Sequence, residues 1–183
     1  MAVAALLVAL LSGGCIFSPK KEKSGGGGTP PPPVPPRTSP HSAIDFLIYA
    51  WNYRDSTLAE QVYASDYSGT SVDQSDPQTG TLSFTKADEV RALGGLELAT
   101  DITRVEVNFG PSTTWVDSKY VGDPPDWVSV AIPKPTVNIY TTSDTYTATG
   151  ADNFEFKLRP VPASPDTLWE IVRWSESKPA TSP

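Results

Sequence analysis

The chain has 183 residues, of which 38% are hydrophobic and 19% are charged, and its formal net charge is −7 at pH 7. This length and composition allow one domain of ordinary size with an appendage. One cysteine excludes an intrachain disulfide, one cysteine and one histidine exclude a zinc site of those residue types, and the acidic balance argues against nucleic acid as a partner.

The first fifteen residues predict an export signal. An apolar run extends through Leu11, which is too short to span a bilayer but suits the apolar part of a signal peptide. Small residues ending in Gly14 precede Cys15, and this segment resembles the lipobox of bacterial lipoproteins. The resemblance implies cleavage between Gly14 and Cys15, lipid attachment at Cys15 and, because Ile16 follows, delivery to the outer membrane of the cell envelope. The alternative is an unmodified thiol behind an ordinary signal peptide.

Residues 16–40 are predicted to be a tether, because they show no hydrophobic period. They contain the glycine run Gly25–Gly28, which is typical of a flexible joint, and the proline run Pro30–Pro33, which is typical of an extended spacer. Four basic and one acidic side chain give this segment a charge of +3, whereas ten basic and twenty acidic side chains give residues 41–183 a charge of −10. The basic residues are expected to face an anionic membrane surface. A proline-rich ligand for a peptide-binding domain is the alternative.

The first helix of the domain is predicted from the segment Ala43–Trp51, in which only Asp45 is polar. Ser39 followed by Pro40 provides an N-cap and a proline at the first helical position. We expect this helix to continue through Tyr53 and Arg54.

Two further helices are expected before any strand. Asp55 or Ser56 should cap a short second helix that ends near Ala64, and residues 65–80 contain turn formers. Thr85 and Asp88 approximate a capping box for a third helix, which is expected to stop at residues 94–95, a glycine pair.

After the third helix the hydrophobic period changes to two, which predicts half-buried antiparallel strands. These strands are expected around residues 105–109, 128–132, 137–139, 154–158 and 168–174, with a bulge or bend at Pro133 and Pro135. Helices followed by strands indicate an α+β domain over residues 41–176. Residues 177–183 are predicted to be a disordered tail.

A family resemblance rests on two short segments. Asn52, Arg54 and Asp55, followed by Val62–Tyr67, resemble the opening of NTF2-like proteins, and Trp169–Trp174 resembles the last strand of their SnoaL-like relatives. The resemblance implies an NTF2-like cone, in which N-terminal helices pack on a curved antiparallel sheet. It further implies an interior able to hold a small ligand, isomerase or dehydratase activity in some members, and pairing into a homodimer through the sheet. Another helix-and-sheet fold of the cystatin kind is the rival.

Candidates for chemistry in such a cone are few. The charged residues of the strands, such as Glu106 and Glu155, alternate with apolar ones and are expected to point to solvent. Asp45 is therefore the best candidate for a buried carboxylate, although it suits a helix N-terminus equally well. His41, the only histidine, is expected to be exposed. Residues 117, 123 and 126 are aspartates that could hold calcium, or could simply be an acidic loop, so we assign no catalytic residue, no metal site and no cofactor.

The aromatic residues near the first two helices provide the remaining candidates. We expect the mouth of a cavity to be lined by Asp45, Tyr49, Trp51, Tyr53, Tyr63 and Tyr67. The alternative is that these rings simply fill the cone. The sequence thus predicts a membrane-anchored envelope lipoprotein that binds a small apolar ligand or another envelope protein. A lyase or isomerase acting in the cone, or a purely structural envelope protein, are the other hypotheses.

Overall fold

The computed structural model describes residues 31–73, 81–149, 153–163 and 166–178. The predicted signal peptide, Cys15 and the tether up to residue 30 lie outside these residues, as do residues 179–183 of the predicted tail. The described elements are α2 (Pro40–Asn52), α3 (Ser56–Val62), β1 (Tyr63–Asp73), β2 (Thr81–Thr85), α4 (Lys86–Leu98), β3 (Ile102–Asn108), the 3₁₀ turn η2 (Ser112–Thr114), β4 (Val116–Ser118), β5 (Val128–Ala131), β6 (Thr136–Thr141), β7 (Thr145–Thr149), β8 (Asn153–Pro162) and β9 (Thr167–Lys178).

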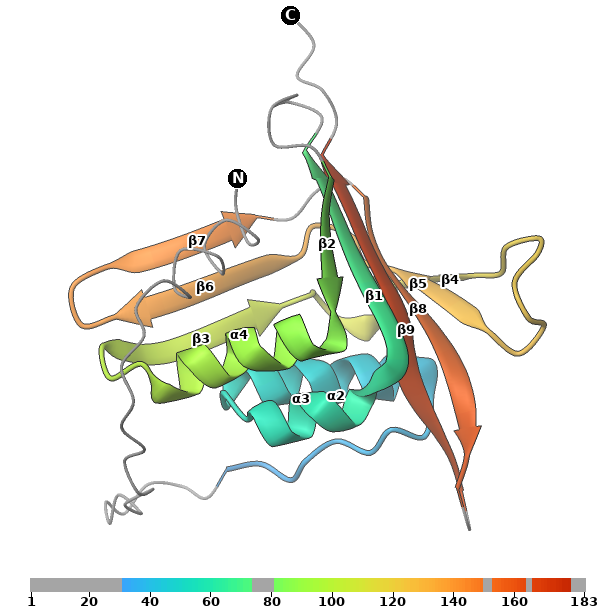
Figure 1. Ribbon diagram of the computed structural model, residues 1–183, viewed down its shortest axis with the longest axis horizontal. Coiled ribbons are helices and arrows are strands. Elements are labelled where there is room, and N and C mark those ends of the chain that lie inside the picture. The colour runs from blue at the N-terminus through green and yellow to red at the C-terminus, as the bar shows by residue number, and fades with distance from the viewer. Residues whose placement is uncertain (1–30, 74–80, 150–152, 164–165, 179–183) are drawn as a thin grey trace, which may run out of the picture.

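The strands form two sheets that enclose one side of the helices. One sheet has the order β2-β1-β9-β8-β5-β4 and the other has the order β3-β6-β7. All pairings are antiparallel except that of β1 with β9, which is parallel. Figure 1 shows the smaller sheet on the left and the larger one on the right, with α2, α3 and α4 across the space between them. The predicted α+β class is confirmed.

The first helix begins where the sequence predicts, because its cap is complete. The Ser39 side chain accepts a hydrogen bond from the Ser42 backbone N–H, and the Ser42 hydroxyl accepts one from the Ser39 backbone N–H. Pro40 occupies the first helical turn. The predicted extension through Arg54 is wrong. Arg54 has a φ of 54°, a left-handed conformation that ends the helix, and Asp55 then caps α3.

Two boundary predictions failed because tertiary pairing outweighs local composition. The sequence predicts turns over residues 65–80, but β1 continues from Tyr63 to Asp73 and pairs with both β2 and β9. The rest of that prediction, residues 74–80, lies outside the described residues. The glycine pair at residues 94–95 was expected to end α4, but the helix continues to Leu98. The fully buried Leu93 and Leu96 lie on either side of that pair, and their packing outweighs the low helix propensity of glycine.

The predicted bend at Pro133 and Pro135 is where the chain changes sheets. β5 belongs to the larger sheet and β6 to the smaller one, and Lys134 between them has a φ of 52°. Proline supplies no backbone donor, so neither sheet can continue through this segment. The bend places the two sheets on different sides of one interior.

The segment that precedes α2 lies against the domain. Below the helices in Figure 1 it runs from residue 31 towards α2. The Arg37 carbonyl accepts a hydrogen bond from the Trp169 backbone N–H at 2.8 Å, and the Pro32 carbonyl accepts one from the Tyr49 hydroxyl at 3.1 Å. At the other end, β9 continues to Lys178, past residue 176.

The hydrophobic core joins the helices to the inner faces of both sheets. Ile44 on α2, Val105 on β3, Leu158 on β8 and Ile171 on β9 are at most 2% exposed and belong to one cluster. In the part of the chain that the structure describes, none of the helices has the length and hydrophobicity needed to cross a membrane.

Candidate functional site

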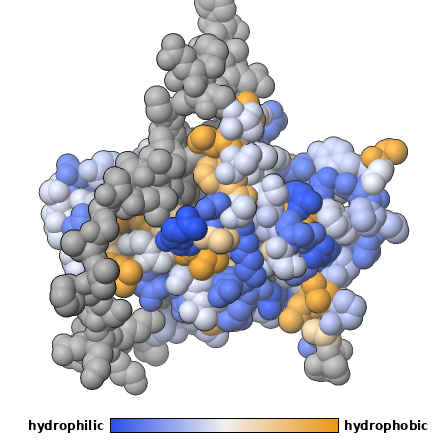
Figure 2. Space-filling model, in the orientation of Figure 1, coloured by the Kyte–Doolittle hydropathy of each residue, from blue (hydrophilic) through white to orange (hydrophobic). Residues whose placement is uncertain are grey.

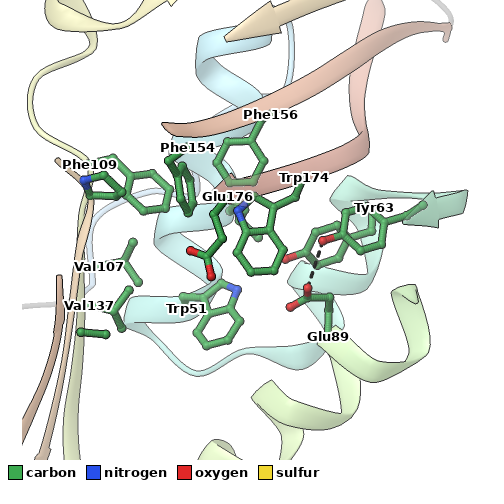
Figure 3. Close-up of a pocket in the computed structure, with 14 residues that line it drawn as sticks. Trp51, Tyr63, Glu89, Val107, Phe109, Val137, Phe154, Phe156, Trp174 and Glu176 are labelled. Atoms are coloured by element: carbon green, nitrogen blue, oxygen red, sulfur yellow. Dashed lines mark hydrogen bonds between the residues drawn. The ribbon is translucent and has the colours of Figure 1, made fainter. Parts of the chain in front are cut away.

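A cavity lies between the two sheets and the helices α2 and α4 (Figure 3). Its volume is about 70 Å³, several times the roughly 10–15 Å³ that one buried water requires. Its wall is formed by Leu47, Trp51, Tyr63, Tyr67, Glu89, Val107, Phe109, Pro135, Val137, Ala148, Phe154, Phe156, Trp174 and Glu176. The wall thus takes residues from α2, α4 and both sheets, but none from α3 or from β2, β4 and β5 of the larger sheet.

One end of the cavity is apolar. Phe154 and Phe156 alternate along β8 and point inward, and Phe109 follows β3, so that three phenylalanine rings gather with centroid separations of 5.2–5.9 Å. Val107 and Val137 come from adjacent strands of the smaller sheet, where they are register partners. These side chains offer no hydrogen bonds to water, so this end favours apolar groups.

The other end contains a buried carboxyl group, that of Glu89 on α4. Its residue is 7% exposed, and the Tyr67 hydroxyl donates a hydrogen bond to Glu89 Oε1 at 3.0 Å. Burial raises the pKa of Glu89 from 4.5 to about 7. The helix itself directs Glu89 inward, because residues 89, 92, 93 and 96 form the buried stripe of α4 and Glu89 is the first of them.

Two tyrosines of β1 continue the polar end. The rings of Tyr63 and Tyr67 are 4.5 Å apart, and burial raises the pKa of both hydroxyls well above the ordinary value, with Glu89 adding to the effect. A Cβ atom on Gly69 would lie 2.7 Å from the Tyr67 hydroxyl oxygen and 2.8 Å from Cε3 of Trp174. Only glycine at this position allows the tyrosine and the indole ring to approach the strand so closely.

A second carboxyl group comes from the end of β9. Glu176 Oε1 accepts a hydrogen bond from the Ser71 hydroxyl at 2.5 Å, and burial raises the pKa of Glu176. Trp174 precedes it by two residues, so both side chains lie on the same face of the strand. The Trp174 Nε1–H is buried and has no hydrogen-bond partner among the described residues. The cavity wall therefore contains two carboxyl groups and one unused donor.

Comparison with known proteins bears on the fold. No protein-family model matches the sequence, and no curated protein matches it either. An NTF2-like superfamily protein from Salmonella enterica has a similar structure, with 14% sequence identity, coverage of 77% of this chain and 89% of that one, and a TM-score of 0.54. The chain has the NTF2-like fold.

Two further solved structures show the same fold. An NTF2-like protein of unknown function in nutrient uptake from Rhodospirillum rubrum is 18% identical, covers 75% of this chain and 95% of its own, and has a TM-score of 0.51. A protein from Novosphingobium aromaticivorans, named as a candidate scytalone dehydratase, is 9% identical, covers 74% and 78%, and has a TM-score of 0.50. Identities this low establish the NTF2-like architecture and not the activity.

The NTF2-like cone brings together only part of the predicted aromatic set. Trp51, Tyr63 and Tyr67 belong to the cavity wall. Tyr49 on α2 and Tyr53 just after the helix do not belong to it, and their rings stack on each other with centroids 4.3 Å apart.

Asp45, the candidate for a buried carboxylate, does not line the cavity. Asp45 is exposed, because the buried residues on either side of it, Ile44 and Phe46, turn it towards solvent. Its place in the cone is taken by Glu89 and Glu176, neither of which was a candidate. Glu89 could have been found by drawing the buried stripe of α4, and Glu176 by continuing the alternation from Trp174.

The other polar candidates lie outside the cavity wall. His41 Nε2 is 2.7 Å from Asp117 Oδ1, and its ring makes an edge contact with Trp115. Asp123 pairs with Lys157 at 2.7 Å. Two of the three aspartates considered for calcium are thus engaged elsewhere, and among the described residues no three His, Cys, Asp or Glu side chains are grouped to hold a metal.

The outer face of the larger sheet carries ion pairs. Arg159 contacts both carboxylate oxygens of Asp66, at 2.9 and 3.0 Å, and also Glu170 at 2.5 Å.

Figure 2 shows that the face of the molecule in that view is mostly hydrophilic, with hydrophobic residues in small separate patches. Because its wall gathers many apolar and aromatic side chains in one place, the cavity is the strongest candidate site.

Proposed function

We propose that the domain binds a small, largely apolar molecule in the cavity of its NTF2-like cone. The observation that carries this proposal is the cavity itself, whose wall combines phenylalanine rings with two carboxyl groups. Water at the phenylalanine end has few hydrogen-bond partners, so an apolar group would replace it favourably.

A fluorescent apolar probe tests this function. N-phenyl-1-naphthylamine is uncharged and brightens when it leaves water, and we expect it to bind the purified full-length protein saturably. Ala148 is 5% exposed and lines the cavity, so Ala148→Leu should fill the space and weaken binding at least about tenfold. Thr149→Leu adds similar bulk on the exposed face of the same strand and should leave binding unchanged. Equal binding by the two variants would contradict the proposal.

We also propose that this binding domain is exported and held at the membrane through a lipid on Cys15. Support comes from the apolar run, the small residues before Cys15, and the glycine- and proline-rich segment that would separate an anchor from the domain. In cells of a lipoprotein-producing bacterium fed radiolabelled palmitate, the wild-type chain should be labelled and the Cys15→Ser variant should not. Fractionation should place the wild-type chain in the outer membrane. Label on the variant would refute the assignment of Cys15.

A second candidate function, acid–base catalysis in the cone, is favoured by Glu89. A carboxyl group with a pKa of about 7 beside the Tyr67 hydroxyl can exchange a proton with a bound molecule at neutral pH. An isomerase or lyase of this kind removes a proton next to a carbonyl group. Such activity would incorporate deuterium from D₂O into cyclic ketones, detected by NMR, and would be lost in Glu89→Gln. An unchanged background rate with the wild-type protein would count against it.

A further inference from the structure

The cavity wall has an unbalanced charge. Among the described residues that form it are the carboxyl groups of Glu89 and Glu176, and none of these residues is a lysine, arginine or histidine. Lys86 lies on the same helix as Glu89, but its ammonium donates to the backbone carbonyl of Tyr63 at 2.9 Å and is not part of the wall. A buried carboxylate without a positive partner is expensive, so the two acids leave an unmet electrostatic demand in the cavity.

The cavity wall around these two acids is also rich in aromatic rings. Trp51, Trp174, Tyr63 and Tyr67 all belong to the wall, and in the view of Figure 3 the two indole rings lie between the carboxyl groups of Glu176 and Glu89. The face of an aromatic ring carries partial negative charge and attracts cations, most strongly for tryptophan. Aromatic faces and carboxyl groups therefore favour the same kind of ligand group.

On the basis of the proposed binding function, we propose that the ligand is a hydrophobic organic cation, a protonated amine or a quaternary ammonium compound. Its charged end lies between Glu89, Glu176 and the indole rings, and its hydrocarbon part lies against the phenylalanines. A neutral hydrocarbon ligand would displace water from the carboxyl groups and bring neither charge nor hydrogen bonds in return. An anionic ligand would add like charge to the two acids. A cation alone supplies the charge that the wall lacks.

The affinity for a cation should rise with pH. The titratable groups that act on Glu89 are Tyr63 and Tyr67 of β1, Glu176 of β9 and its own neighbour Asp88, and none of these is cationic. Glu89 has a pKa of about 7, so a bound cation favours its ionised form and releases a proton. A neutral ligand that accepts a hydrogen bond from protonated Glu89 would show the opposite dependence, with affinity falling from pH 6 to pH 8.

Three probes of similar shape test the proposal by displacement of N-phenyl-1-naphthylamine from the full-length protein. They are phenyltrimethylammonium, its neutral isostere tert-butylbenzene, and the anion benzenesulfonate. At pH 8 the cation should bind at least about tenfold more tightly than the neutral isostere, and benzenesulfonate should bind most weakly. The preference should shrink about tenfold at pH 6, a comparison that needs no variant.

Matched variants assign the effect to the cavity. Glu89→Gln and Glu176→Gln should each reduce the preference for the cation about tenfold. Glu60→Gln removes the same charge from an exposed position on α3 and should leave the preference unchanged. If the neutral isostere binds as tightly as the cation, the proposal is overturned while the binding function stands. If N-phenyl-1-naphthylamine itself does not bind, both are overturned.

Discussion

Replacing Glu89 by glutamine should change how the stability of the domain depends on pH. In the folded protein the Glu89 carboxyl has a pKa of about 7, compared with 4.5 for an ordinary glutamate. Between these two values the folded state holds a proton that the unfolded state has lost. The free energy of unfolding therefore falls as pH rises through this window, and the full penalty is present above pH 7.

The size of the effect follows from the shift. At about 1.36 kcal/mol per pH unit, a rise from 4.5 to about 7 corresponds to about 3 kcal/mol. Glutamine cannot ionise, and its side-chain oxygen can still accept the hydrogen bond that Tyr67 donates. The stability of Glu89→Gln relative to wild type should therefore increase by about 2–3 kcal/mol between pH 5 and pH 8.5.

Urea denaturation at several pH values between 5 and 8.5 measures this difference. Carboxyl groups that do not interact with Glu89 titrate alike in both proteins and cancel in the comparison. The exposed substitution Glu60→Gln serves as the control and should follow the wild-type curve. In Glu176→Gln one of the charges that raises the pKa of Glu89 is absent, so its stability should fall less steeply than that of wild type. Parallel curves for wild type and Glu89→Gln would refute a buried, proton-holding Glu89.

Two further substitutions test how the backbone serves the cavity. Gly69→Ala should destabilise the fold by about 1–3 kcal/mol, because its Cβ would lie 2.8 Å from Trp174 Cε3. Gly95 lies on the exposed side of α4, and a Cβ there would have no atom within 4 Å. Gly95→Ala should therefore stabilise the fold by about 0.5–1 kcal/mol. Arg54→Gly should be more stable than Arg54→Ala by about 1 kcal/mol, because the φ of 54° suits glycine and both variants lose the same hydrogen bonds to the carbonyls of Leu96 and Ile102. Thermal or urea unfolding measures each pair, and equal stabilities within a pair would contradict the respective interpretation.

Local rules predicted the features that local interactions determine. The start of α2 follows from Ser39 and Pro40, and the start of α4 follows from Thr85 and Asp88, whose side chains cap each other's backbone N–H groups. The inward direction of Phe154 and Phe156 follows from alternation along β8. The NTF2-like fold could be inferred from these elements together with the resemblance of short segments.

Long-range pairing determines the features that the sequence did not reveal. The residues of β1 from Ser65 onward are mostly small and polar, as in turns, yet they form a strand because β2 and β9 provide partners on both sides. Small residues are required there for packing. Gly69 faces Trp174 across the β1–β9 pair, and a larger side chain would push the indole ring out of the cavity wall. Composition alone cannot separate a turn from a strand that must leave room for its neighbours.

The two glutamates escaped prediction for a related reason. Glu89 sits on a helix whose other buried residues are Ala92, Leu93 and Leu96, so a carboxyl group occupies a position that core packing would give to an apolar side chain. The sequence therefore shows a weak amphipathic pattern where the helix meets the cavity wall. A leucine at this position would avoid a penalty of about 3 kcal/mol above pH 7. A domain that retains a costly acid in its interior, beside Glu176 and an unpartnered indole N–H, has the organisation expected of a binding site and not of a filled core.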